Sequence, residues 1–363
     1  ALWPLSAVPK TRQWVQENVQ EGLLRDVKAA FRISPGQEPR FALGYDFADA
    51  DVRFIKTLPP IRKGSGYATI DGNNYTMVLD AGEVTPPAGG RIDVAGSVFS
   101  VLDILQKPAQ AEIRMKTRSS LTAALSLLDE PPFRFLTKAG KSADLGEGQA
   151  EISAVLRMPL VDRIKTEDVS FRVEGQLREV VSDVLVPGQR LSAPALRLVA
   201  TPAGMEVSGA GTLGPVPFDG KFNQPFGPEA QGRARVGAEV ELSPKGLAAF
   251  APGRPAGFAE GRGRARLVLD LPKGSPPQMV LTSDLKGLAL AVPEIGWRKA
   301  AGTAGRLEVE AQLGKPAAVT KLRLEAPGLA ATGRVILRAD GRLDRAEFAE
   351  VRAGDWLVAP VTL

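Results

Sequence analysis

The sequence predicts an all-β fold, an elongated and mostly antiparallel curled sheet with few short helices. The first observation is the stretch Gly263 to Leu271, where apolar residues alternate with mostly charged ones. This period of two is typical of a strand with one apolar and one solvated face. The second is a near copy of this stretch, Gly232 to Leu242. The third is the high content of turn residues, 38 Gly and 29 Pro, which separate roughly twenty such segments with few helices between them.

The first 39 residues are expected to form a helix and a leading segment. Pro9 to Gly22 reads as a short helix, because Trp14, Val15, Val19 and Leu23 form a helical apolar stripe. Val27 to Ile33 resumes a strand-like pattern before the turn at Pro35-Gly36. The first eight residues are apolar but lack a preceding basic flank, so we do not expect a signal peptide there.

Residues 40–226 are expected to form a first segment of the sheet. Phe41, Leu43, Tyr45 and Phe47 share one face, and Asp71 to Asn74 is a good hairpin turn. The segment is interrupted near residues 119–138 by a helical cap. Ser119 to Leu128 has a serine cap, and Phe133 to Lys138 is expected to add a turn. Leu185 to Pro194 is expected to be a loop.

Residues 227–363 are expected to continue the same sheet as a second segment, after a boundary at Asn223 to Pro228. A short helix is expected at Ser243 to Phe250, followed by a loop rich in Gly and Pro. After the strand Gly263 to Leu271, the expected strands are Met279 to Ser283, Leu285 to Val292, Leu307 to Leu313, Val319 to Ala326, Gly333 to Leu337, Leu343 to Val351 and Trp356 to Leu363.

Composition excludes several kinds of chemistry. The chain has no Cys and no His, which removes thiol chemistry, the commonest metal ligand and the usual general base. The net charge of +5 is mild, and most Arg residues alternate with apolar residues, which favours a solvated strand face over a nucleic-acid patch. No apolar run approaches the ~20 residues of a spanning helix, so any membrane anchor is expected outside this sequence.

The short motifs in the chain do not indicate catalysis. Gly209 to Gly214 matches a dinucleotide fingerprint, but Pro215 and Pro217 prevent the helix that would receive a pyrophosphate. Asp49 and Asp51 lie two apart on one expected strand and are read as solvated edge residues, because no further acids cluster with them. We therefore expect no enzyme activity, no catalytic residues, no metal site and no cofactor.

The apolar strand faces allow two interpretations. They either form a closed sandwich core or line an open aliphatic trough, and the large number of strands favours the trough. Ten residues of strand span ~33 Å, which is wide enough to fold around an acyl chain. The candidate lipid-groove residues are Ala234, Val236, Val240, Leu242, Leu267, Leu269, Leu271, Leu307, Val309, Leu313, Leu322 and Leu324.

Four stretches together resemble the AsmA-like bacterial envelope proteins, in particular the large YhdP-type members. They are Leu2 to Ala7, Leu125 to Leu136, Leu185 to Leu198 and Gly354 to Leu363. The resemblance implies a long taco-like β-groove in the periplasm, anchored to the inner membrane, that moves phospholipid toward the outer membrane. Its partners would be phospholipid acyl chains, the inner membrane and outer-membrane or envelope proteins, with no nucleic acid.

Two other functions remain open from the sequence. An envelope scaffold could assist outer-membrane protein biogenesis through its sheet edges. A polysaccharide-acting enzyme would need clustered carboxylates and aromatic platforms, and the three Tyr and four Trp are widely scattered.

Overall fold

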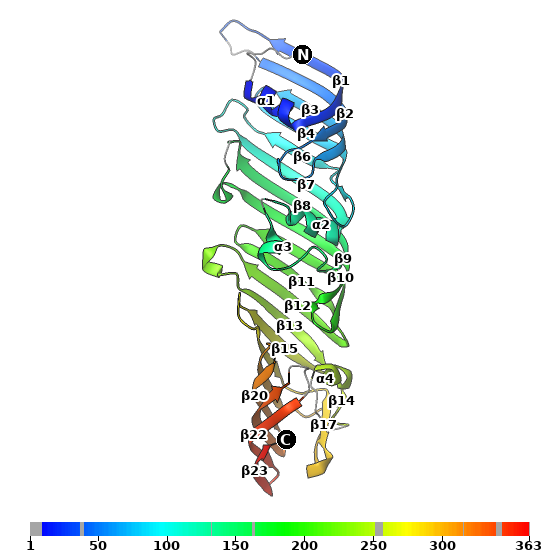
Figure 1. The fold of residues 1–363 in the computed structure, drawn as a ribbon, viewed down its shortest axis with the longest axis vertical. Coiled ribbons are helices and arrows are strands. Elements are labelled where there is room, and N and C mark those ends of the chain that lie inside the picture. Colours follow the sequence, from blue (N-terminus) through cyan, green and yellow to red (C-terminus); the bar gives the residue numbers. More distant parts are fainter. Residues whose placement is uncertain are drawn as a thin grey trace. The chain divides into compact units, whose positions relative to one another are not determined.

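The computed structural model describes residues 9–36, 40–131, 133–161, 164–250, 257–314, 316–338 and 343–362. Over these residues the protein is mostly β, with one large antiparallel sheet of 20 strands and few short helices (Figure 1). This confirms the predicted all-β, antiparallel class. Two compact units are described separately here. The N-terminal unit is Ala1–Leu185 with Arg197–Pro202, and the C-terminal unit is Val186–Leu196 with Ala203–Leu363. The stretch Leu2 to Ala7 lies outside the described residues.

Strands of the N-terminal unit pair antiparallel and mostly with their neighbours in the chain, an arrangement that needs no crossover connection. β4 pairs with β6, and the two-residue β5 bridges β4 to β7. The strands are β1 (Val19–Arg32), β2 (Arg40–Val52), β3 (Ile61–Asp71), β4 (Asn74–Val84), β5 (Ile92–Asp93), β6 (Ser97–Val101), β7 (Gln110–Ser120), β8 (Glu147–Pro159) and β9 (Ser170–Val186). The predicted turn at Asp71 to Asn74 joins β3 to β4.

The predicted N-terminal helix is too long. The helix α1 spans Pro9–Asn18, and β1 begins at Val19, opposite Val52 of β2. Pairing with β2 therefore overrides the helical stripe that extends to Leu23. The Asn18 side chain ends the helix by donating a hydrogen bond to the Trp14 carbonyl at 2.8 Å.

The predicted cap is present as two short helices, α2 (Leu121–Leu128) and α3 (Phe135–Lys138). The Ser120 hydroxyl caps α2 by accepting from the Ala123 N–H at 3.0 Å. Ala123 and Leu127 pack against a buried cluster of Leu79, Val84 and residues after β4. The cap therefore contributes to the core at one end of the strands. A short 3₁₀ helix, η1 (Thr166–Asp168), lies between β8 and β9.

The C-terminal unit continues the hairpin pattern. Its strands include most of β10 (Gln189–Thr201), then β11 (Gly204–Leu213), β12 (Val216–Pro225), β13 (Ala234–Leu242), β15 (Gly263–Leu271), β16 (Gln278–Ser283), β19 (Arg306–Gln312), β20 (Ala318–Ala326), β21 (Leu329–Leu337), β22 (Leu343–Ala353) and β23 (Leu357–Thr362). The loop predicted from Leu185 to Pro194 is wrong. Only Pro187 and Gly188 form a turn. Gly188 has a φ of 73°, which allows the chain to reverse within two residues.

A separate three-stranded sheet interrupts this order. It consists of β14 (Ala259–Gly261), β17 (Leu288–Val292) and β18 (Trp297–Lys299). The strand predicted at Leu285 to Val292 therefore starts three residues later and does not join the large sheet. Gly261 and Gly287 both have φ of 86°, which lets the two backbones approach each other as the chain leaves the large sheet. The remaining short helices are α4 (Pro244–Phe250), η2 (Pro228–Ala230) and η3 (Pro293–Ile295).

Bulges bend several strands of the N-terminal unit. Asp26 in β1, Asp49 in β2, Lys63 in β3 and Glu179 in β9 have φ between 49° and 53°. The register of their strand pairs shifts at or beside the first three of these positions. A bulge bends its strand and increases the local twist. These residues are not glycines, so the sequence gives no signal for them.

Candidate functional site

The candidate site is one face of the large sheet in the C-terminal unit. Antiparallel register brings the predicted groove residues into rows that cross the strands. One row is Val236, Leu269, Met279 and Ala311, and the next is Ala238, Leu267, Leu281, Val309 and Leu322. Flanking pairs are Ala234 with Leu271, Val240 with Ala265, and Leu307 with Leu324. Together these residues are called the aliphatic face.

Most of the aliphatic face is half-buried. Val236, Leu267 and Leu269 lie in the middle of the sheet but retain partial exposure. In a two-layer sandwich, central inward side chains interdigitate with a second sheet and are buried. Leu313 differs from the other predicted residues, because it lies one position past β19 and is 40% exposed. The sheet therefore carries a continuous aliphatic surface that protein covers incompletely.

The small sheet covers one end of the aliphatic face. Leu288, Leu290 and Trp297 form a buried cluster with Leu242 and Ala265 of the large sheet. Val240, Leu307, Leu324 and Leu247 of α4 pack against this cluster. Four predicted groove residues, Val240, Leu242, Leu307 and Leu324, therefore belong to a protein core.

Two side chains, Trp297 and Lys299, hold the small sheet in place through hydrogen bonds. The Trp297 ring nitrogen donates to the Pro327 carbonyl at 2.9 Å, which ties β18 to the turn after β20. The Lys299 ammonium, only 3% exposed, donates to the carbonyls of Leu285 and Leu288 at 2.7 and 2.8 Å. Burial lowers the pKa of Lys299, and the carboxylate of Asp284 partly opposes that effect. The sequence offered no signal that these residues would cover the site.

The opposite face of the same strands is charged and paired. Arg235 and Asp270 face each other with their charged atoms 3.1 Å apart. Lys321 lies 2.8 Å from Glu308 and 2.9 Å from Glu310. The hydrogen bond from Lys321 lowers the pKa of Glu308, and the same contact raises the pKa of Lys321. The reverse face of these strands is therefore polar, in contrast to the aliphatic face.

The N-terminal unit repeats the two-faced arrangement. A row of Met77, Phe99, Ile113, Leu156 and Phe171 crosses five strands on one face. On the other face, Glu112 accepts from Arg114 at 2.6 Å and from Arg157 at 2.7 Å, which lowers its pKa. Each unit thus has one apolar side and one ion-paired side.

A pair of tyrosine hydroxyl groups lies on the otherwise apolar side of the N-terminal unit. The hydroxyl groups of Tyr45 and Tyr75 lie 3.3 Å apart. Burial raises the pKa of Tyr75, and the neighbouring Tyr45 raises it further. Tyr75 therefore stays neutral, which suits a position beside the apolar cluster of Val101, Ala109 and Ala111.

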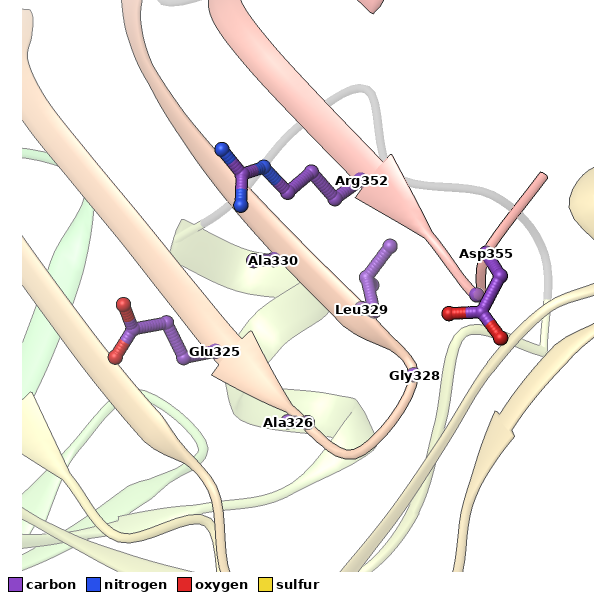
Figure 2. Close-up of a pocket in the computed structure, with 8 residues that line it drawn as sticks. Glu325, Ala326, Gly328, Leu329, Ala330, Arg352 and Asp355 are labelled. Atoms are coloured by element: carbon purple, nitrogen blue, oxygen red, sulfur yellow. The ribbon is translucent and has the colours of Figure 1, made fainter. Parts of the chain in front are cut away.

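Two hollows have charged residues in their walls. The first, about 450 Å³, is lined by Glu325, Leu329, Arg352 and Asp355, and Figure 2 shows the charged ends of Glu325, Arg352 and Asp355 lying apart from one another. Glu325 is held by Arg323 at 2.6 Å. In the second hollow, about 570 Å³, Lys63 and Arg91 each bind Glu83 at 2.9 Å and lower its pKa.

The two sequence motifs considered for a nucleotide or metal site both lie on strands of the large sheet. Gly209 to Gly214 lies almost entirely within β11, and β12 follows it in place of a helix. Asp49 lies at a bulge, whereas Asp51 accepts a hydrogen bond from the Lys63 N–H at 3.0 Å. Among the described residues, no group of three acidic side chains is placed to hold a metal ion.

In the part of the chain that the structure describes, every helix is too short or too polar to cross a membrane. Comparison with family models, curated proteins and solved structures gives no match for this chain.

Proposed function

We propose that this chain is a non-enzymatic lipid-binding element, whose aliphatic faces shelter phospholipid acyl chains while head groups remain in water. It forms part of a curled β-groove that conducts phospholipids between two membranes. The observation that carries this proposal is the half-buried row of Val236, Leu269 and Met279 at the centre of a sheet whose other side is ion-paired.

The chemistry of the aliphatic face suits a sliding lipid. Burying an acyl chain is worth ~0.8 kcal/mol for each CH₂ group, so two chains bind without a specific pocket. The rows consist of Ala, Val, Leu and Met with no polar interruption, so neighbouring positions offer a lipid similar energies. Such a surface permits a phospholipid to move along the sheet. It does not set the direction of that movement, which comes from other components.

Curvature is the second requirement of a groove. The bulges at Asp26, Asp49 and Lys63 fall on three consecutive strands. Because bulges bend and twist strands, they favour a sheet that curls toward one face. This supports a curled groove in the N-terminal unit.

The cellular setting in this proposal is the periplasm of a Gram-negative envelope, at the inner membrane. It rests on the resemblance of Leu125 to Leu136, Leu185 to Leu198 and Gly354 to Leu363 to AsmA-like proteins of the YhdP type. In this setting the groove supplies phospholipid for outer-membrane biogenesis.

A second candidate function, an envelope scaffold for outer-membrane protein biogenesis, is favoured by the strand β1. It pairs with β2, and its apolar side chains are exposed on both faces, with Leu24 at 58% exposure on one face and Leu23 at 49% on the other. An exposed edge of this kind can add a strand from another protein.

The test is native mass spectrometry of the chain purified without detergent from a Gram-negative periplasm, followed by lipid extraction. The proposal predicts co-purifying phospholipid of mixed head groups, which the delipidated protein takes up again from vesicles. Protein that is lipid-free and does not take up lipid would contradict it. If the lipid-free protein instead formed stable complexes with outer-membrane proteins, the result would support the scaffold function.

A further inference from the structure

The helical cap of the N-terminal unit carries an exposed surface that the aliphatic face does not explain. It comprises residues 128–131 and 133–141 and is called the α2–α3 tip. Phe135 is 55% exposed and Leu128 is 45% exposed. The Phe133 and Phe135 rings stack with centroids 5.6 Å apart and planes at 12°. Large apolar side chains therefore gather on the outside of the protein.

Three cationic residues belong to the same tip as this apolar pair. Arg134, Lys138 and Lys141 are exposed, lie within eight residues of one another, and form no ion pair among the described residues. The acidic side chains of the tip are less exposed. The two oxygens of Asp129 accept hydrogen bonds from the N–H and hydroxyl of Thr137, both at 2.7 Å. The outer surface of the tip is therefore cationic as well as aromatic.

The tip is held in one conformation before any ligand arrives. The Asp129–Thr137 bonds fasten α3 to the end of α2, and they lower the pKa of Asp129. At the other end of α3, Gly140 at φ 66° lets the Lys141 N–H reach the Leu136 carbonyl at 2.9 Å. A fixed shape reduces the entropy lost when the surface binds a partner.

We propose that the α2–α3 tip attaches the protein to an anionic lipid bilayer. Phe135 and Phe133 enter the region between head groups and acyl chains, where aromatic rings are favoured. Arg134, Lys138 and Lys141 bind the phosphates around them. A bilayer suits this combination, because its interface offers phosphates to the cations and a boundary region to the aromatic rings at the same depth. The proposal is independent of lipid uptake by the aliphatic faces, since attachment leaves the lipid in the bilayer.

The test is flotation of the full chain with vesicles of phosphatidylcholine, alone or with about 30% phosphatidylglycerol. Each cation near such a surface strengthens binding by about fivefold, so R134Q/K138Q/K141Q should weaken binding by about a hundredfold. F135S should weaken it by about tenfold through lost apolar burial. The matched control K245Q/K273Q/K286Q removes three exposed lysines of the C-terminal unit and should bind as the unmodified chain does.

Binding to anionic vesicles that weakens in salt, and that both tip variants reduce, supports the proposal. Equal binding by the triple tip variant and its control overturns it. Equal binding to neutral vesicles, or no vesicle binding by the unmodified chain, overturns it as well. Circular dichroism of each variant checks that the fold is retained.

Discussion

Val236 lies directly opposite Leu269 across the β13–β15 pair, and both side chains are half-buried on the aliphatic face. The adjacent residues Arg235 and Asp270 face each other on the reverse side, 3.1 Å apart. One step along the backbone thus separates an apolar contact from an ion pair. This separation allows each face to be altered without altering the other.

Leu269→Asp is expected to lower phospholipid binding by about tenfold or more, because it places a carboxylate where an acyl chain would lie. Val236→Asp should act in the same way. Both variants should remain folded, since each position already has partial access to water. Binding is measured by transfer of a fluorescent phospholipid from vesicles to the protein, and folding by circular dichroism.

The control is Val280→Asp on the neighbouring strand. Val280 lies beside Met279 but on the opposite face, and it is 38% exposed. Lipid binding should be unchanged in this variant. If Leu269→Asp unfolds the protein while Val280→Asp does not, the aliphatic face is a closed core and the groove proposal is wrong.

Lys299→Met is expected to destabilise the C-terminal unit by about 1–3 kcal/mol, because it leaves buried carbonyl groups without donors. The carbonyls concerned belong to Leu285, Leu288 and Ala300. Chemical denaturation followed by tryptophan fluorescence measures the change, since Trp297 lies in the same small sheet. Equal midpoints for both proteins would show that the Lys299 contacts contribute nothing.

The pH dependence of Lys299 has a definite sign. Its pKa is below the ordinary value of 10.5 in the folded protein, so the unfolded chain binds more protons between the two values. The free energy of unfolding should therefore rise as pH increases through that window. Lys299→Met should remove this rise, and an identical pH profile in the variant would contradict the assignment.

Acid should weaken the charged face. The pKa values of Glu308 and Glu347 lie below their ordinary 4.5, mainly through hydrogen bonds from Lys321 and Arg334. Their contribution is complete above 4.5 and is lost as pH falls through the lowered values. The melting temperature should fall over this acidic range, and the decline should be shallower in Glu308→Gln/Glu347→Gln. Thermal melts followed by circular dichroism at several pH values measure both slopes.

Gly287→Ala should destabilise the small sheet by more than about 1 kcal/mol. Gly287 has φ of 86°, and a Cβ there would lie 2.0 Å from the Arg262 carbonyl oxygen. Gly237→Ala is the matched control, because a Cβ at Gly237 meets nothing within 4 Å. Hydrogen exchange of β17 amides should accelerate in the first variant alone. Similar exchange in both would show that the close approach is not required.

The sequence predicts strands better than it predicts what covers them. The alternation in Gly263 to Leu271 gives both ends of β15, because a solvated face and an apolar face impose a period of two on every residue. Glu239 and Arg266 also fall on the predicted wet face. In contrast, the small sheet joins Ala259 to Leu290 and Val292 to Trp297, contacts that no local pattern specifies.

The sequence predicts which face of its strand each residue of the candidate site occupies, but it does not predict how exposed that residue is to solvent. Val236 and Leu242 share a strand face and an apolar character, yet Leu242 is 8% exposed and lies in the cluster around Leu288, whereas Val236 is half-buried. Their difference depends on α4 and the small sheet. Leu313 shows the other limit, because apolar alternation continues one residue beyond the strand. Bulges at acidic residues such as Asp49 also leave no mark in the sequence.

The pairing of strands in chain order has a consequence for how the protein is made. Many strands of the large sheet in either unit meet a partner that the ribosome has just synthesised, as β2 follows β1 and β22 follows β21. Closing such short loops costs little chain entropy, so hairpins can add one at a time during translation. The small sheet forms later, because β14 cannot pair until Leu288 to Leu290 of β17 have been synthesised. We therefore expect the aliphatic face of β13 and β15 to be exposed to chaperones until residue 299 has left the ribosome.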